Sequence, residues 1–113
     1  MNRPLTRSLS AVLILAALAA CSPRDAADQM ARRTAESVVR PIVDDAMTEP
    51  QALGVTRCIV TNASPDEVQA LLRDVGVYAG SSTVATVAGI AARPETLACI
   101  RGSGLPVPSL GGI

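Results

Sequence analysis

The sequence predicts a small all-α domain of about four helices, the first kinked at Pro41, with one disulfide and a mobile C-terminal tail. Two observations support this fold class. Apolar residues recur at three- and four-residue steps along much of the chain, as one face of a helix requires. A strong helix start signal occurs at Ser64-Pro65-Asp66-Glu67, and no segment stands out as a strand with a partner strand.

The first twenty residues have the layout of an export signal and not of the folded domain. Arg3 and Arg7 form a basic start, and an apolar stretch runs from Leu9 to Ala20. That stretch is about a dozen residues long, whereas a membrane-spanning helix needs roughly twenty. We therefore predict that residues 1–20 are a cleaved signal peptide and not a transmembrane helix.

The end of this signal carries a more specific pattern. The tetrapeptide Leu18-Ala19-Ala20-Cys21 resembles the lipobox of bacterial lipoproteins. The resemblance covers the first two dozen residues or so. It implies cleavage before Cys21, a diacylglycerol on its thiol and a fatty acid such as palmitate on its amine. The alternative is an ordinary signal peptide in which Cys21 happens to follow the cleavage site.

The same resemblance suggests a location. A lipidated Cys21 anchors the chain to a cell membrane, facing the periplasm, and several acyl chains make such an anchor nearly permanent. In lipoproteins of Gram-negative bacteria an Asp after the cysteine signals retention in the inner membrane. Ser22 therefore favours the outer membrane.

After cleavage, about ninety residues remain, enough for one small domain. We assign 21–101 to this domain and 102–113 to a flexible tail rich in Gly, Pro and Ser. Loss of Arg3 and Arg7 leaves eight arginines against ten acidic residues. A slightly acidic protein argues against a nucleic-acid partner.

The first helix is predicted over 24–47. Asp28 with Arg32, and Arg32 with Glu36, are four-residue pairs that stabilise a helix. Pro41 lacks an N–H, so it is expected to kink this helix or divide it in two. Packing of its apolar face on the domain is favoured over a position on a membrane surface, because that face is mostly Ala.

Pro50 and Gly54 predict a turn over 48–54. The apolar run 55–61 suits a buried strand or a helical turn, and helix is favoured because no partner strand is evident.

The next helix has the best local signal in the domain. Ser64 fits the N-cap, Pro65 the first helical position and Glu67 the third, which together form a capping box. The helix is expected to bury Val68, Leu71, Leu72 and Val75 and to stop at Gly76, a left-handed residue.

Two further helices are expected before the tail. Ser81 or Ser82 caps one that runs through Ala92, and Arg93-Pro94-Glu95 starts a short one closed by Gly102. The tail beyond carries four apolar residues, which either dock on the core or on a partner or remain exposed in a disordered segment; disorder is the favoured interpretation. They are Leu105, Val107, Leu110 and Ile113.

With Cys21 used for lipid, Cys58 and Cys99 remain as an even pair in an exported chain. A structural disulfide between them is the favoured interpretation, and it would stabilise the domain by roughly 4 kcal/mol. Two buried free thiols come second. A redox-active pair comes last, because no Cys-x-x-Cys spacing is present.

The composition argues against an enzyme. The chain has no His and no Lys, so serine and cysteine lack their usual base and metals lack their commonest ligand. Two distant cysteines do not make a zinc site. Asp44 and Asp45 are adjacent and do not converge on one point, and Asp66 and Glu67 suit a helix start. We predict no catalytic residue, no metal and no cofactor beyond the covalent lipid.

Three functions remain open. The favoured one is a periplasm-facing lipoprotein with a non-catalytic interaction or structural role and an envelope protein as partner, similar in layout to many small Gram-negative lipoproteins. Arg32, Arg33, Arg40 and the apolar tail are its likeliest contact residues on sequence grounds. The alternatives are a small-molecule or lipid-binding module of the envelope and a redox-sensing envelope protein.

Overall fold

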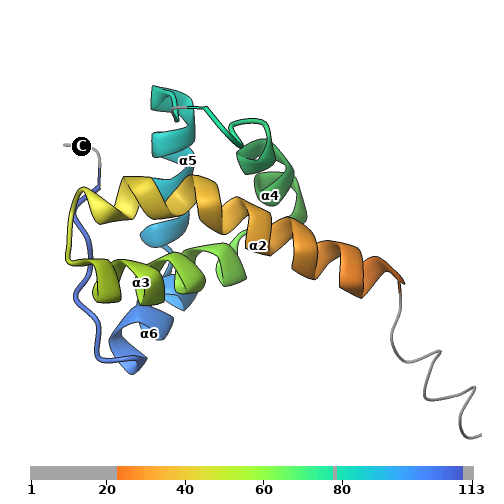
Figure 1. The fold of residues 1–113 in the computed structure, drawn as a ribbon. Coiled ribbons are helices and arrows are strands. Elements are labelled where there is room, and N and C mark those ends of the chain that lie inside the picture. The colour runs from red at the N-terminus through yellow and green to blue at the C-terminus, as the bar shows by residue number, and fades with distance from the viewer. Residues whose placement is uncertain (1–22, 78, 111–113) are drawn as a thin grey trace, which may run out of the picture.

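Helices account for all the regular structure in the described part of the chain. The computed structural model describes residues 23–77 and 79–110. Its helices are α2 (Pro23–Asp44), α3 (Glu49–Asn62), α4 (Pro65–Leu72), α5 (Ser81–Ala91) and α6 (Pro94–Gly102) (Figure 1). The all-α class is confirmed. The described residues form five helices where the sequence predicts about four, because the segment from Glu49 to Asn62 forms a complete helix.

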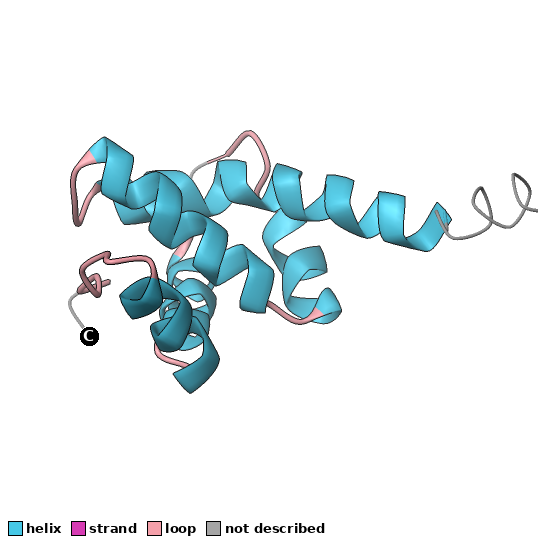
Figure 2. Cartoon of the chain, turned by 90° about the horizontal axis from the view of Figure 1, so that it is seen from below, coloured by secondary structure: helices cyan, strands magenta, loops and turns pink. Residues whose placement is uncertain are grey.

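Helix α3 is the centre of the arrangement. It runs back alongside α2, and it also contacts α5 and α6, while α4 packs on α2 and α5 (Figures 1 and 2). The prediction of a turn over 48–54 is wrong. Glu49 and Pro50 occupy the first turn of α3, where an acid and a proline favour a helix start.

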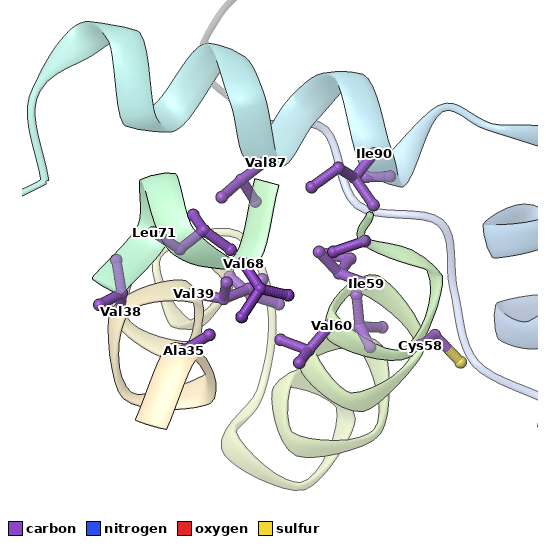
Figure 3. Packing of buried hydrophobic residues seen from close by; sticks show 14 of the residues in the cluster. Ala35, Val38, Val39, Cys58, Ile59, Val60, Val68, Leu71, Val87 and Ile90 are labelled. Carbon is purple, nitrogen blue, oxygen red and sulfur yellow. The ribbon is translucent and has the colours of Figure 1, made fainter. Parts of the chain in front are cut away.

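The core lies where α2, α3, α4 and α5 meet. Figure 3 shows Val87 and Ile90 of α5 above side chains of the other three helices. Burial of this aliphatic cluster is the main driving force for folding. The buried apolar residues are Ala35, Val38, Val39, Val43, Ala52, Val55, Cys58, Ile59, Val60, Ala63, Val68, Leu71, Val87, Ile90, Ala91 and Ile100.

Proline begins most of these helices. Pro23, Pro65 and Pro94 are the first residues of α2, α4 and α6, and Pro50 is the second residue of α3. The first N–H groups of a helix have no partner within it, so a proline there sacrifices no hydrogen bond. Pro41 is the exception inside a helix. It does not divide α2, which continues to Asp44 with Val38, Val39 and Val43 buried on either side of it.

The capping box at the start of α4 is confirmed. The Glu67 N–H donates to Ser64 Oγ at 3.2 Å, and the Ser64 N–H donates to Glu67 Oε1 at 2.8 Å. The helix is shorter than expected, because it ends at Leu72 and leaves Val75 43% exposed. Gly76 has a φ of 80°, the left-handed conformation that was predicted.

Helix α5 begins differently from the prediction. Its N-cap is Gly80, so neither Ser81 nor Ser82 is the cap. Thr83 in its first turn donates a hydrogen bond to Asp74. This bond ties the turn after α4 to the start of α5.

The end of α6 directs the tail onto the core. The Leu105 N–H donates to the Ile100 carbonyl and the Gly104 N–H to the Arg101 carbonyl, both at 3.0 Å, and Gly104 has a φ of 71°. This is a Schellman motif, with Gly104 and not Gly102 as its left-handed residue. The reversal brings Leu105 against α3, where a Cβ at Gly54 would lie 2.5 Å from Leu105 Cδ1.

Residues 105–110 have no regular secondary structure, as the sequence predicts. Within this segment Leu105 and Leu110 pack against the core, while Val107 is 46% exposed. The sequence leaves open whether these apolar residues dock on the core, dock on a partner or remain exposed. In the structure Leu105 and Leu110 dock on the core. The fourth of them, Ile113, lies outside the described residues.

Candidate functional site

The predicted lipid anchor lies just before the first described helix. Cys21, the preceding Leu18, Ala19 and Ala20, and Ser22 are outside the described residues. Helix α2 begins at Pro23, and every residue from Pro23 to Met30 is exposed. This first part of α2 projects from the domain (Figures 1 and 2). Eight helical residues span about 12 Å, so residues 23–30 place the start of α2 about that far from the rest of the domain.

None of the five described helices is both long enough and apolar enough to cross a membrane.

The disulfide between Cys58 and Cys99 is present. It joins α3 to α6 across a sequence separation of 41 residues, with the two Cα atoms 5.7 Å apart. Cys58 is buried and Cys99 is partly exposed. Because the two cysteines bond to one another, neither is available to pair with Cys21.

Arg32 has a structural role that the sequence did not reveal. Its guanidinium donates to the carbonyls of Val60 and Ala63, at 2.6 and 2.9 Å, and to Asp28 Oδ2 at 2.8 Å. These carbonyls lie at the C-terminal end of α3, where the helix dipole favours a cation. The predicted Asp28–Arg32 pair is thus confirmed. Arg32 is only partly exposed, and its guanidinium is already bonded to these groups, so it is less free to contact a partner than the sequence suggests.

A second arginine reaches the same end of α3. Arg93 Nη1 donates to the Asn62 carbonyl at 3.2 Å, and the guanidinium forms a bidentate pair with Glu67, with N···O distances of 2.8 and 2.5 Å. The hydrogen bond from Arg93 is the main cause that lowers the pKa of Glu67, assisted by Ser64 and opposed by burial. The same pairing raises the pKa of Arg93. Together they join α3, α4 and the α5–α6 turn.

The Glu67–Arg93 pair predicts a specific dependence of stability on pH. The pKa of folded Glu67 lies below its ordinary value of 4.5, so the pair stabilises the protein above pH 4.5 and this stabilisation is lost as the pH falls through the lowered pKa. In Glu67→Gln the capping box survives, because Gln also serves at that position. We expect acid titrations of the unfolding free energy to show the wild type more stable at neutral pH, with the two proteins converging below pH 4.5.

Exposed Asp45, changed to Asn, is the control because it does not contribute to the pKa shift of either Glu67 or Arg93, and it should leave the pH dependence of the wild type nearly intact. Parallel curves for the wild type and Glu67→Gln would contradict the assignment.

The other two predicted contact arginines differ from one another. Arg40 Nη2 lies 2.8 Å from Glu49 Oε1 and Arg40 Nε lies 3.8 Å from Asp44, so it links the two ends of the α2–α3 turn. Arg33 is exposed on α2. Of the three arginines proposed from the sequence, Arg33 is therefore the one suited to contact a partner.

One side of the domain carries an apolar groove of about 670 Å³. It lies between α5, α6 and the segment 107–110, and this volume falls in the range of small-molecule sites, roughly 300–1,000 Å³. Its lining is Ala85, Ala88, Gly89, Ala91, Ala92, Leu97, Arg101, Val107, Pro108, Ser109 and Leu110.

Local sequence signals did not point to this groove. One wall belongs to α5, a helix that the sequence predicts, but the opposite wall is the tail, which is expected from the sequence to be flexible. The groove depends on the Schellman turn at Gly104 and on Leu105 against Gly54, which bring residues far apart in the sequence together.

The groove combines an apolar lining with few polar side chains. It contains one cation, Arg101, one hydroxyl, Ser109, and no carboxylate. Among residues 23–77 and 79–110 no group of three or more His, Cys, Asp or Glu side chains is arranged to hold a metal ion.

Comparisons of the chain with protein-family models, with curated proteins and with solved structures find no significant match.

Proposed function

We propose that this chain is a lipid-anchored envelope protein that holds a non-catalytic helical domain on the periplasmic side of a membrane, where it engages an envelope partner. The observation that carries the proposal is the projecting start of α2. It is exposed through Met30 and begins two residues after the cysteine of the lipobox-like sequence. A domain held by lipid at Cys21 would stand about one short helix away from the bilayer surface.

The disulfide supports the same proposal. Disulfides persist in exported proteins, and the Cys58–Cys99 bond leaves Cys21 as the cysteine for lipidation. The domain also has little need of a further anchor, since several acyl chains on one residue bind a membrane nearly irreversibly.

A Cys21→Ser variant tests the anchor. In a Gram-negative host grown with an alkyne analogue of palmitate, the wild type should take up label and sediment with membranes. Cys21→Ser should lose the label and retain its signal peptide. Ser22→Ala, which keeps the cysteine, is the matched control and should behave as the wild type. Label on Cys21→Ser at the wild-type level would overturn the proposal.

The sorting proposal is tested at the neighbouring residue. Ser22→Asp should move the labelled protein from outer-membrane to inner-membrane fractions in a density gradient. An unchanged distribution would show that residue 22 does not direct this protein in that host.

The partner is best sought through α2. A photo-crosslinking amino acid at Arg33, on the exposed part of the helix, should yield adducts with an envelope protein when intact cells are irradiated. A crosslinker at exposed Arg57, on α3, is the comparison site. A third crosslinker is placed in the tail. If none of the three positions gives an adduct with an envelope protein, the proposal of a protein partner fails.

A further inference from the structure

The groove between α5, α6 and the segment 107–110 suggests what the domain binds. Nine of its eleven lining residues are apolar or glycine. Gly89 lies on its α5 wall, and a Cβ there would meet no heavy atom within 4 Å. The groove therefore offers open apolar space against a helix of small side chains.

Arg101 supplies the charge. It is exposed, lines the groove and forms no ion pair with any residue that the structure describes. This contrasts with Arg32, Arg40 and Arg93, each of which is held by a carboxylate. A second groove, on the other side of the tail, shares Ser109 and Leu110 but carries Asp45 and no cation. Of these two grooves beside the tail, only the one between α5 and α6 has a positive charge in its lining.

An occupant must match both features. The eight aliphatic side chains of the lining can contact an apolar chain. Arg101, with no acidic residue in the lining, can pair with one anionic group. A polar ligand such as a sugar or nucleotide needs several hydrogen-bonding side chains, and Ser109 is the only other one in this lining. Charge complementarity therefore favours an anionic amphiphile with a single chain.

We propose that this groove binds a long-chain fatty acid, with its hydrocarbon along the small residues of α5 and its carboxylate on Arg101. The segment 105–110 lies at the end of the domain away from the start of α2 (Figures 1 and 2). Its residues 107–110 form one wall of the groove. A ligand there would be remote from the bilayer that holds Cys21. The inference concerns the domain itself and does not depend on the lipid anchor.

Photo-crosslinking tests the proposal on the full chain. The probe is palmitic acid carrying a diazirine, added to the protein purified in a mild detergent, and labelled peptides are located by mass spectrometry. We expect label in peptides that cover α5, α6 and the segment 107–110. Excess palmitate should abolish it, and the uncharged methyl ester should compete much less well.

Two variants and a control make the test specific. Gly89→Leu places a side chain in the groove from a position where an added Cβ has open space, and it should lower labelling about tenfold. Arg101→Gln removes the charge partner and should weaken binding about fivefold, the size expected of an exposed ion pair. Arg57→Gln removes an exposed arginine from α3, outside the groove, and should change nothing.

Label spread along the chain, or label unchanged in Gly89→Leu, would overturn the proposal. So would stronger displacement by an apolar peptide with a free carboxyl terminus than by palmitate, which would identify a peptide site. Uptake of lipid at Cys21 is measured separately and is unaffected by either variant, so failure of the groove and failure of the anchor are distinguishable.

Discussion

Reduction of the Cys58–Cys99 disulfide is expected to lower the free energy of unfolding by about 4 kcal/mol. The bond closes a loop with a sequence separation of 41 residues, and in the chain-entropy model a loop of that length removes about this much from the unfolded state. A small domain has a total stability of about 5–15 kcal/mol, so the loss is a large part of it. Urea unfolding with and without a thiol reductant measures the difference.

A double variant, Cys58→Ala with Cys99→Ala, separates the bond from the reagent. It should resemble the reduced wild type, and reductant should leave it unchanged. Cys58 is buried, so part of the stability that the double variant loses will come from the cavity left by the missing sulfur. Equal stability of the oxidised and reduced wild type would contradict the prediction.

Reduction should act first on the part of the fold that the disulfide holds. The bond fastens α6 to α3, and the tail follows α6 directly through the Schellman turn at Gly104. Amide exchange is therefore expected to accelerate in α6 and 105–110 before it does in α2. The reduction potential decides the redox-sensing alternative, since a value well below about −300 mV indicates a structural bond.

The second large effect is expected from truncation of the core at the centre of α3. Ile59→Ala should cost about 3 kcal/mol, within the range of 2–5 kcal/mol seen for such changes. Ile59 is fully buried in the cluster that α3 shares with α2, α4 and α5 (Figure 3). The surrounding helices relax only partly around a deleted side chain, so the cavity should persist.

Urea unfolding of the wild type, Ile59→Val and Ile59→Ala measures the free energy of unfolding as the side chain is shortened. The Val variant should lose about 1 kcal/mol. Arg57→Ala, on the exposed side of the same helix, is the control and should stay within about 0.5 kcal/mol of the wild type. A cost for Ile59→Ala no larger than that for Arg57→Ala would mean that α3 is not the centre of the core.

Much of the fold follows from signals within a few residues of one another. The capping box at Ser64 and Glu67 and the left-handed Gly76 were predicted because each depends on its immediate neighbours. The disulfide follows from the number of cysteines, since the predicted lipidation of Cys21 leaves Cys58 and Cys99 as one pair. The same local rules failed at Pro50 and Gly54, which suggest a turn in isolation.

The full length of α3 was decided by tertiary packing. Gly54 is tolerated inside the helix because Leu105 lies against it, where a larger side chain would meet Leu105 Cδ1. Nothing near Gly54 in the sequence encodes that contact, since Leu105 arrives only through the turn at the end of α6. Local propensity is a weak guide wherever long-range packing opposes it.

What the sequence by itself determined is the helical class and the disulfide, which rest on short-range patterns and on the number of cysteines. Only the tertiary structure decided that Arg32 and Arg93 hold the end of α3, and that α5, α6 and the tail enclose a groove beside Arg101. The partners in those contacts are about thirty residues apart and become neighbours only when burial of apolar surface packs the helices together.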